Sequence, residues 1–437
     1  MLVLALASAS AFASPSAPAP GPVPTLPSAF DDFDDVPLPD RDLWQRIRMG
    51  FALEALDSPL VAEHEAWYSS RPEYIKRFVD RGSLYLHYIV EQVEKRKMPM
   101  EIALLPVIES AFTPKATSRA KASGLWQFIP STGKNYGLKQ DWWRDNRRDV
   151  VAATDAALNY LQRLHDMFGS WELALAAYNC GEGKVARAIA ANEKRGLPTD
   201  YMSLKLPPET VNYVPKLIAV KNIVLSPPSY GIDLESVPDE PYFTEVQAPK
   251  RIDVKVAAQL AGMTEAEFVA LNPAHNKPVA IAPEGTLILP LDKADAFKAN
   301  LESYDKPLVS WTTYAAHKGE SLDAIAHKHN VTMAQLRAAN DPIKLDKKGR
   351  LRASGPVLVP IKRDPKEPIK VAQLTAEKRA AQAAIPAAPT LRIYTVRPGD
   401  TLYAIAQRYR TAVDTLLDLN NLPASVVLQP GLKLRVP

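Results

Sequence analysis

The sequence contains only one cysteine, Cys180, in 437 residues. A disulfide within the chain is therefore excluded. A thiol nucleophile is not indicated either, because no histidine motif accompanies this residue. An excess of one charge is also missing, since 53 basic and 49 acidic residues give a net charge of +4, spread along the chain. A nucleic-acid-binding surface would concentrate its basic residues, so we expect no nucleic-acid partner.

Residues in metal-ligand spacing are scarce. His327 and His329 are too few for a metal site, and we expect them on a solvated helix face. The acidic run at residues 31–35 lacks the glycine and the closing glutamate of a calcium-binding EF-hand loop. The sequence therefore predicts neither a metal nor another cofactor.

The apolar run at residues 1–13 is too short to span a bilayer. It ends in the small-x-small pattern Ala11-Phe12-Ala13, which is typical of a signal peptide, although basic residues before the apolar run are absent. We predict export to the periplasm or cell envelope, with cleavage after Ala13. A disordered Ala/Ser/Pro-rich tail is the alternative. No cysteine that could carry a lipid stands next to the run, so a lipid anchor is not indicated, and its length indicates no transmembrane span.

Helical periodicity dominates residues 41–226. Leu86, Ile89, Val90 and Val93, for example, occupy positions i, i+3, i+4 and i+7 of one helix face. Strand-like alternation is scarce in this region. The sequence therefore predicts an all-α domain here, in which Asp149 caps the start of one helix.

The segments on either side of this domain have linker composition. Residues 14–40 are rich in Pro, Ser and Ala and then acidic, which predicts a disordered lead-in. Prolines punctuate residues 227–243, which predicts a second linker. An Ala/Pro/Lys-rich stretch at 362–391 predicts a tether.

An internal repeat fills the rest of the chain. Residues 322–340 (LDAIAHKHNVTMAQLRAAN) resemble residues 402–420 (LYAIAQRYRTAVDTLLDLN), and a weaker copy spans 254–272. Each copy is followed by a short apolar strand that ends in proline, so each unit is expected to run strand, helix, helix, strand. We predict three small α/β modules, the first degenerate and the second divergent, at 244–300, 311–361 and 392–437.

The most informative stretch ends at Glu109. Seven non-polar residues precede this carboxylate in the chain. Burial disfavours the ionised form and raises the pKa of a carboxyl group, as a general acid for a glycosidic oxygen requires. The alternative is a glutamate at a helix end that faces water. Glu101, Glu172 and Glu182 are competing candidates with less apolar sequence around them.

Four motifs occur in order along the helical region. They are Glu109-Ser110, Gly124-Leu125-Trp126-Gln127, Ala177-Tyr178-Asn179 and Glu209-Thr-Val-Asn-Tyr213-Val214. This series resembles that of the family 1 lytic transglycosylases. The strings MPMEIALLPVIESAF and GLWQFIPSTGKNYGL are similar to the membrane-bound lytic murein transglycosylase D type in particular. The resemblance covers roughly residues 43–226 and, through the repeats, much of the remainder.

The resemblance implies a goose-lysozyme-like helical domain with a saccharide cleft, in which Glu109 is the catalytic acid and then the base. It also implies that Gly124 lets the backbone approach the ligand, whereas we expect Trp126 mainly to pack in the core. Ser110 would help to hold the cleft geometry, and Tyr178 and Asn179 would lie near the carboxyl group and the sugar N-acetyl group. The implied substrate-binding residues are Ser110, Gln127, Tyr178, Asn179 and Tyr213.

None of the motifs offers a second acid beside Glu109, although glycosidases usually use two carboxylates. The resemblance implies substrate assistance by the N-acetyl group instead. The C6 hydroxyl then attacks C1, and the MurNAc-β-1,4-GlcNAc bond is cleaved without water to leave a 1,6-anhydro-MurNAc end. A lysozyme-like hydrolase and a non-catalytic wall-binding scaffold are the alternatives.

The repeats resemble LysM modules, which bind glycans that contain N-acetylglucosamine. The copy at 394–437 matches best, the copy at 311–361 is poorer, and the first can be a spacer. Peptidoglycan strands are therefore the expected partner, bound by a monomer. Tethered modules raise the local concentration of an enzyme on an insoluble polymer.

Overall fold

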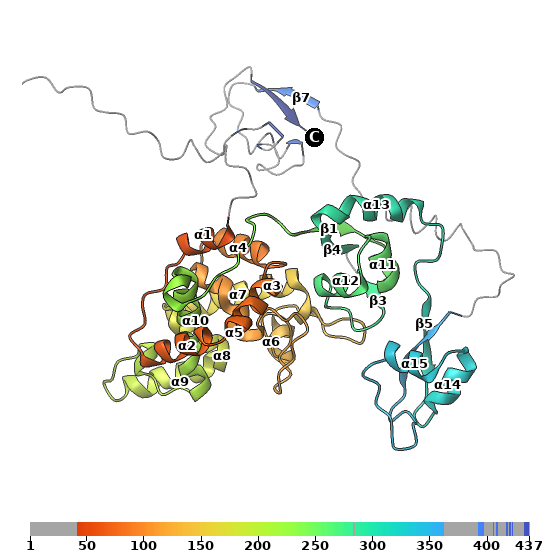
Figure 1. Ribbon diagram of the computed structural model, residues 1–437, viewed down its shortest axis with the longest axis horizontal. Coiled ribbons are helices and arrows are strands. Elements are labelled where there is room, and N and C mark those ends of the chain that lie inside the picture. Colours follow the sequence, from red (N-terminus) through yellow and green to blue (C-terminus); the bar gives the residue numbers. More distant parts are fainter. Residues whose placement is uncertain are drawn as a thin grey trace, which may run out of the picture.

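A computed structural model describes residues 42–361, apart from 283 and 284, together with residues 392–396, 432–436 and a few positions between them. The predicted signal peptide, lead-in and tether lie outside the described residues, as does most of the last module. Figure 1 shows a helical N-terminal body followed by smaller units that combine helices with short strands. The predicted multidomain fold class, helical first and small α/β modules after it, is confirmed.

Ten α-helices build the N-terminal body. They are α1 (Leu43–Met49), α2 (Pro59–Ser69), α3 (Pro72–Gly82), α4 (Leu86–Lys95), α5 (Leu105–Ser110), α6 (Pro130–Asn135), α7 (Val150–Phe168), α8 (Trp171–Cys180), α9 (Glu182–Glu193) and α10 (Pro208–Leu225). Short 3₁₀ helices lie between them at η2 (Met100–Leu104), η3 (Asn146–Arg148) and η4 (Tyr201–Ser203), and η5 (Pro227–Tyr230) follows α10.

Local sequence explains where the two central helices begin and end. The Asp149 side chain accepts a hydrogen bond from the Ala152 backbone N–H at 3.0 Å, which confirms the predicted cap of α7. Gly169 ends α7 in a left-handed conformation. Ser170 then caps α8 by accepting from Leu173 N–H at 3.3 Å. The two caps are consecutive residues, and α7 packs against α8.

The predicted apolar stripe on α4 faces the core. Leu86, Ile89, Val90 and Val93 are all 1% exposed or less. Trp126 is also completely buried, and its indole N–H donates to a threonine hydroxyl on α7. The expectation that this tryptophan packs in the core is therefore confirmed.

A buried ion pair joins η2 to α10. Glu101 is fully buried, and one of its carboxylate oxygens lies 3.0 Å from the ammonium nitrogen of Lys221. The carboxylate also accepts hydrogen bonds from the backbone N–H groups of Ala52 and Leu53. Lys221 donates in turn to the Leu53 carbonyl. This ion pair and its hydrogen bonds therefore connect three parts of the body: the loop that follows α1, the 3₁₀ helix η2, and α10.

The first module consists of β1 (Phe243–Gln247), β2 (Arg251–Asp253), α11 (Val254–Leu260), α12 (Glu265–Leu271), β3 (Val279–Ile281), β4 (Thr286–Pro290), η6 (Leu291–Lys293) and α13 (Ala294–Ser303). The second consists of β5 (Trp311–Ala316), α14 (Leu322–His329), α15 (Met333–Ala339) and β6 (Gly355–Pro360). In the last module β7 (Arg392–Thr395) pairs with β8 (Lys433–Val436). The outer strands of each module pair antiparallel, and the first module adds β2, β3 and α13 to the predicted pattern.

One asparagine has the same role in all three modules. Asn340 donates from its side chain to the Leu358 carbonyl at 2.8 Å and accepts from the Leu358 N–H. Asn272 makes the same pair of bonds in the first module, and Asn420 in the last. In the first two modules the residue that closes the sequence repeat therefore joins the end of the second helix to the last strand, and in the last module it bonds to β8.

We expect Asn340→Ala to loosen the second module. The change leaves the buried Leu358 N–H without its acceptor, which costs about 2 kcal/mol. Exchange of this amide in the full chain should become roughly 30-fold faster. The Ile288 amide, which Asn272 holds in the same way, is the internal control and should not change. Equal exchange of the Leu358 amide in both proteins would contradict the assigned role.

The first module packs against the helical body. The Asp145 N–H donates to the Ala274 carbonyl at 2.9 Å, and the Asn276 N–H donates to the Trp143 carbonyl at 2.8 Å. Trp142 and Trp143 also contact a small apolar cluster that includes residues of the second module. The segment between α6 and α7 therefore contacts both modules.

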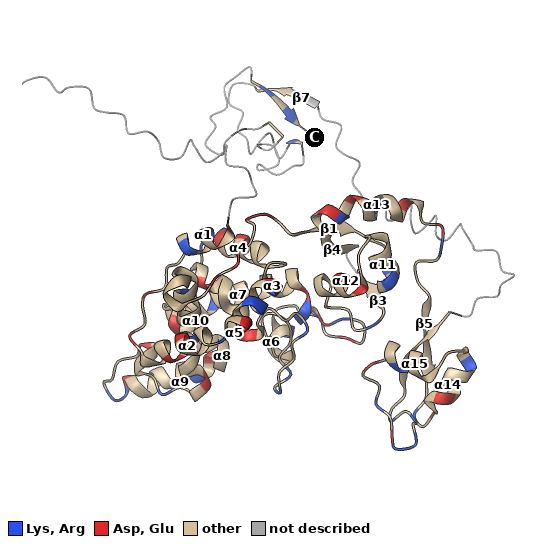
Figure 2. Cartoon of the chain, viewed as in Figure 1, with Lys and Arg blue, Asp and Glu red and all other residues tan. Residues whose placement is uncertain are grey.

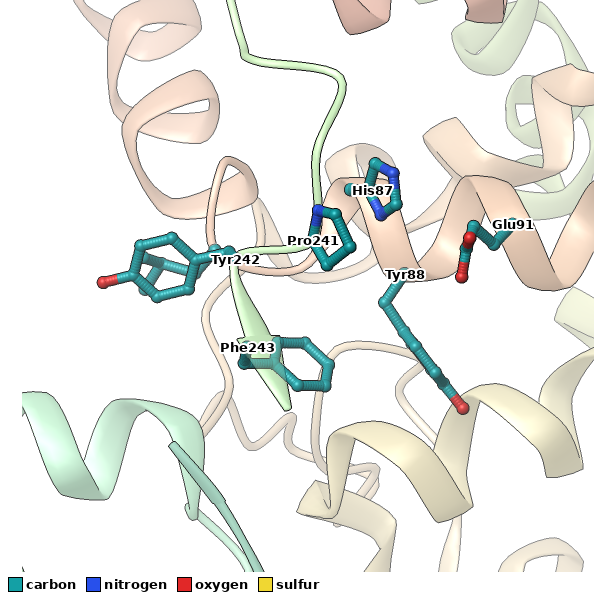
Figure 3. A pocket seen from close by; sticks show the side chains of 7 residues that line it. His87, Tyr88, Glu91, Pro241, Tyr242 and Phe243 are labelled. Atoms are coloured by element: carbon teal, nitrogen blue, oxygen red, sulfur yellow. The ribbon is translucent and has the colours of Figure 1, made fainter. Parts of the chain in front are cut away.

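The predicted linker at 227–243 follows the surface of the helical body. The Leu43 N–H donates to the Val237 carbonyl at 2.8 Å, and Arg46 pairs with Asp239 at 2.8 Å. A small cavity of about 70 Å³ lies where this segment enters β1. Figure 3 shows its lining, which contains none of the predicted site residues: Leu84, His87, Tyr88, Glu91, Pro241, Tyr242 and Phe243.

Candidate active site

Glu109 lies in the last turn of α5. The helix ends at Ser110, and the next two residues, Ala111 and Phe112, have left-handed φ angles of 47° and 52°. Phe112 is 1% exposed. A non-glycine residue adopts this conformation only where packing enforces it. Because the phenyl ring of Phe112 is buried, the chain turns sharply out of the helix after Ser110. Glu109 therefore stands at the end of α5.

The surroundings of Glu109 favour its neutral form. Its pKa is raised to about 7, chiefly because burial removes water from the carboxylate. The Tyr213 hydroxyl donates to Glu109 Oε1 at 2.5 Å and opposes this effect. The charge of Glu209 raises the pKa further, and Lys216 lowers it. The group can therefore hold a proton near neutral pH and can also release it.

The competing glutamates are satisfied by local partners. Glu101 is more deeply buried than Glu109, contrary to the expectation from its sequence neighbourhood, but Lys221 neutralises it. Hydrogen bonds from its own backbone N–H and from a tyrosine hold the pKa of Glu182 below its usual value. Glu172 accepts from a serine hydroxyl at 2.5 Å. The pKa of Glu109, in contrast to that of Glu182, is raised.

Two tyrosines stand beside this carboxyl group. Tyr213, from α10, is 5% exposed and contacts Glu109 directly. Tyr178, from α8, donates its hydroxyl to the Trp126 carbonyl at 2.8 Å. Burial, and then the nearby charge of Glu109, raise the pKa of both phenols well above the usual value. Both hydroxyls therefore stay protonated and can act only as neutral hydrogen-bonding groups.

The remaining predicted residues are held by their own neighbours. The Ser110 hydroxyl bonds to the Leu125 carbonyl at 3.0 Å, and so ties α5 to the second motif. Asn179 accepts from the Thr210 hydroxyl at 2.7 Å, between α8 and α10. Gln127 donates to a carbonyl within its own turn rather than toward Glu109.

Gly124 serves a different purpose from the one expected. Its φ is +88°, and a Cβ atom there would lie 1.9 Å from the Arg147 carbonyl oxygen. The close approach is therefore made by another part of the chain rather than by a ligand. Glycine at this position lets the turn with Gln127 pack against the segment before α7.

Sequence reasoning missed the acidic and basic neighbours of Glu109. Glu209 begins the fourth motif, and the motif pattern does not mark it as a second acid near Glu109. It is exposed on the first turn of α10, and it acts on Glu109 through its charge rather than by contact. Lys216, three residues after Tyr213, opposes it. The helical spacing of 209, 213 and 216 could have revealed that one face carries all three groups.

Within the described residues, no cluster of three or more His, Cys, Asp or Glu side chains could hold a metal ion. In the same part of the chain no helix has both the length and the apolarity needed to cross a membrane. Cys180, at the end of α8, is half-buried, and its thiol is free.

Three family models match the chain. A Transglycosylase SLT domain matches residues 88–198, a LysM domain matches 317–353 and 394–437, and the LysM-like domain of lytic transglycosylase MltD matches 242–306. The membrane-bound lytic murein transglycosylase D of Escherichia coli strain K12 is 35% identical over 410 residues. This alignment covers 91% of the chain and 85% of that relative.

The chain belongs to the membrane-bound lytic murein transglycosylase D family. The resemblance predicted from the four motifs and the repeats is thus confirmed. Lytic transglycosylases are lyases that act on peptidoglycan, and the predicted non-hydrolytic reaction fits this family.

Two solved lytic transglycosylases also match part of this family member. The enzyme Slt from Pseudomonas aeruginosa is 26% identical with a TM-score of 0.26, covering 32% of this chain and 24% of that one. The 70 kDa soluble enzyme from Escherichia coli is 23% identical with a TM-score of 0.27, covering 31% and 23%. At these scores the family assignment depends on the sequence matches alone.

Proposed function

We propose that this protein cleaves the MurNAc-β-1,4-GlcNAc bond of peptidoglycan without water, with Glu109 as the acid and then the base. The observation that carries the proposal is the half-buried Glu109 side chain, whose pKa desolvation raises to about 7 and whose Oε1 accepts from Tyr213. A single group can serve both steps only if its neutral and ionised forms are close in free energy.

The two steps balance in protons. Glu109 gives its proton to the glycosidic oxygen as the bond to C1 breaks, while the substrate N-acetyl group supports the positive charge at C1. The carboxylate then takes the proton of the C6 hydroxyl as its oxygen bonds to C1. Glu109 returns to its protonated form, and the product has a 1,6-anhydro-MurNAc end. The Tyr213 hydroxyl stabilises the carboxylate between the steps.

Substrate contacts are proposed for the residues around this group. Tyr178 and Asn179 both lie in the last turn of α8. The Tyr178 hydroxyl donates to the Trp126 carbonyl, and the Asn179 side chain accepts from the Thr210 hydroxyl. These contacts support a fixed wall for the N-acetyl sugar. Ser110 and Gln127 bond to backbone carbonyls of the turn at residues 124–127, and these hydrogen bonds support a role in shaping the sugar site.

Muropeptide analysis separates this reaction from its alternatives. Purified peptidoglycan digested with the full chain should yield anhydro ends, which mass spectrometry distinguishes from reducing ends by the mass of one water. Reducing ends would instead identify a lysozyme-like hydrolase. Binding to wall sacculi without any soluble product would identify a non-catalytic scaffold.

We expect Tyr213→Phe to move the pH dependence of cleavage. The Tyr213 hydrogen bond lowers the pKa of Glu109, so its loss raises that pKa above about 7. The acid is lost as pH rises through its pKa, and the alkaline limb of the kcat profile should therefore shift upward by about one pH unit.

Tyr160→Phe is the matched control for this shift. It removes a tyrosine hydroxyl that bonds to Glu182 instead of Glu109. Its alkaline limb should coincide with that of the wild type. A downward shift in the Tyr213 variant, or an equal shift in both variants, would contradict the electrostatic role.

We further propose an envelope location, with export through residues 1–13, and glycan binding by the modules at 311–361 and 392–437. The similarity to a relative described as membrane-bound and the LysM matches at 317–353 and 394–437 support this. We also propose that the protein is a monomer. Its catalytic domain would span 41–226, and the degenerate first module would span 244–300.

A further inference from the structure

Three positively charged side chains converge beside a neutral histidine where the helical body meets the first module. Lys115 is exposed on the loop after α5, Arg144 and Arg148 precede α7, and His275 follows α12. His275 is 9% exposed, and its burial, followed by the charges of the other three, lowers its pKa to about 3, so that it is neutral. Figure 2 shows basic and acidic residues interspersed over the helical body. At this junction three positive charges meet.

Only some of these basic side chains have an acidic partner. Arg144 bonds to Asp149 at 2.9 Å. Both Asp145 oxygens accept from the neighbouring Arg147, at 2.9 and 2.6 Å. In residues 42–361, setting aside 283 and 284, neither Lys115 nor Arg148 belongs to an ion pair. Asp145, which Arg147 already engages, acts on Arg148 only through its charge.

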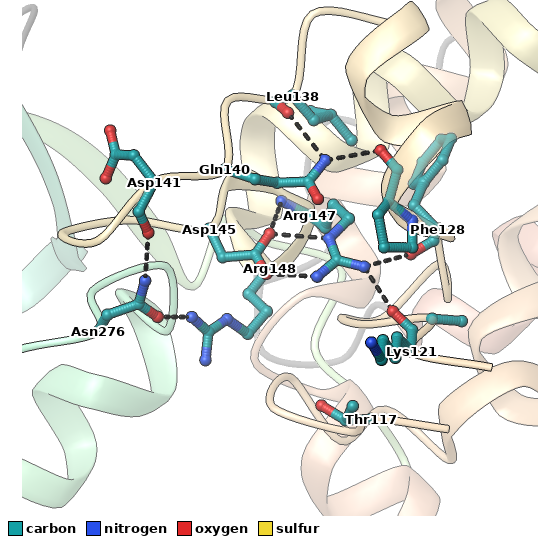
Figure 4. A network of polar contacts seen from close by, with 12 residues as sticks. Thr117, Lys121, Phe128, Leu138, Gln140, Asp141, Asp145, Arg147, Arg148 and Asn276 are labelled. Carbon is teal, nitrogen blue, oxygen red and sulfur yellow. Dashed lines mark hydrogen bonds and ion pairs between the residues drawn. The ribbon is translucent and has the colours of Figure 1, made fainter. Parts of the chain in front are cut away.

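Donor groups at the junction also exceed the acceptors. The Nε atoms of Arg144 and Arg148 are buried and have no hydrogen-bond partner among the described residues. Arg148 donates only to a neutral group, the side-chain oxygen of Asn276, as Figure 4 shows. Buried charged donors usually find acceptors in folded proteins. An anion at this position would supply them.

The cluster borders the segment that we assign to sugar binding. Gln127 donates to the carbonyl of Ala116, the residue next to Lys115. Arg147 donates to the carbonyls of Lys121 and Phe128, on both sides of the Gln127 turn (Figure 4). A ligand on Lys115 and Arg148 would therefore lie beside a glycan strand bound along this turn.

We propose that Lys115 and Arg148, supported by Arg144, bind a carboxylate of the stem peptide that peptidoglycan carries on its muramyl residues. The inference depends on the proposed function, because a glycan strand in the cleft brings the peptide to this place. Guanidinium and ammonium groups match a carboxylate in charge and in hydrogen-bond donors.

Two substrates test this site on the full chain. One is peptidoglycan strands that retain their stem peptides, and the other is the same strands stripped of peptide by an amidase. Lys115→Gln and Arg148→Gln should each raise KM about tenfold on the peptide-bearing strands, with kcat unchanged. Neither substitution should change KM on the stripped strands.

A control variant separates charge recognition from other effects. Lys121→Gln removes the same charge from an exposed side chain of the same loop. It should retain the wild-type KM. An equal change on both substrates, no change at all, or a matching peptide-dependent change in the control would overturn the inference. Failure of the wild type on both substrates would instead refute the proposed function.

Discussion

Glu109→Gln reduces the rate of peptidoglycan cleavage by at least about 10³-fold. Glutamine has nearly the same shape and can still accept from the Tyr213 hydroxyl, but it cannot donate a proton and take one back. General acid–base catalysis contributes about 10²–10⁴-fold for one group, and here the same group serves both steps. The measurement is the release of soluble muropeptides from purified peptidoglycan by the two proteins.

The same variant should fold at least as well as the wild type. Because burial raises the pKa of Glu109 from its ordinary value to about 7, the folded state loses stability as pH rises between these two values. Glutamine avoids that cost, so the variant should be more stable at pH 8 by up to about 3 kcal/mol. Binding to wall sacculi should be retained. Cleavage at the wild-type rate by the variant would exclude Glu109 as the acid.

Lys221→Met lowers the free energy of unfolding by about 3–5 kcal/mol. The ammonium group of Lys221 is the charged partner of Glu101, which is fully buried. Its removal leaves an uncompensated carboxylate in the core, and breaking such a pair is costly. Urea unfolding of the full chain, followed through the helical signal, measures the loss.

Lys76→Met is the matched control for this effect. It breaks an exposed pair with Glu235, in which both side chains are more than half accessible. Solvent already screens those charges, so the unfolding curve should barely move. Equal midpoints for the Lys221 variant and the wild type would show that the Glu101 pair does not stabilise the body.

Local patterns in the sequence predicted much of the fold. The stripe on α4 and the Asp149 cap depend on residues a few positions apart, and both are present. The repeat likewise predicted strand, helix, helix, strand, because the same apolar positions recur in each copy. Elements of this kind are fixed by short-range spacing, which can be read from the chain.

Contacts between distant segments could not be predicted in this way. The burial of Glu101 is tolerated because of Lys221, which lies 120 positions later in the sequence. The reason for Gly124 is the carbonyl of Arg147, and no pattern indicates that these two segments meet. The docking of the first module on the segment before α7 is likewise a property of the folded chain.

In the candidate site, too, the sequence predicted some features and only the folded structure shows others. The motifs identified Glu109 and Tyr213 as site residues, and the structure places one in hydrogen-bond contact with the other. The influence of Glu209 and Lys216 on the pKa of Glu109 requires the relative positions of α5 and α10. Sequence therefore predicted the groups, whereas their electrostatic coupling depends on tertiary structure.

The most direct test of this account is the titration of Glu109 itself in the full-length protein. Infrared difference spectra between the wild type and Glu109→Gln, recorded from pH 4 to pH 9, isolate the absorption of this one carboxyl group. We predict a midpoint near the value of about 7 that burial produces. A midpoint close to that of an ordinary exposed glutamate, about 4.3, would contradict the claim that one carboxyl group both gives and recovers the proton.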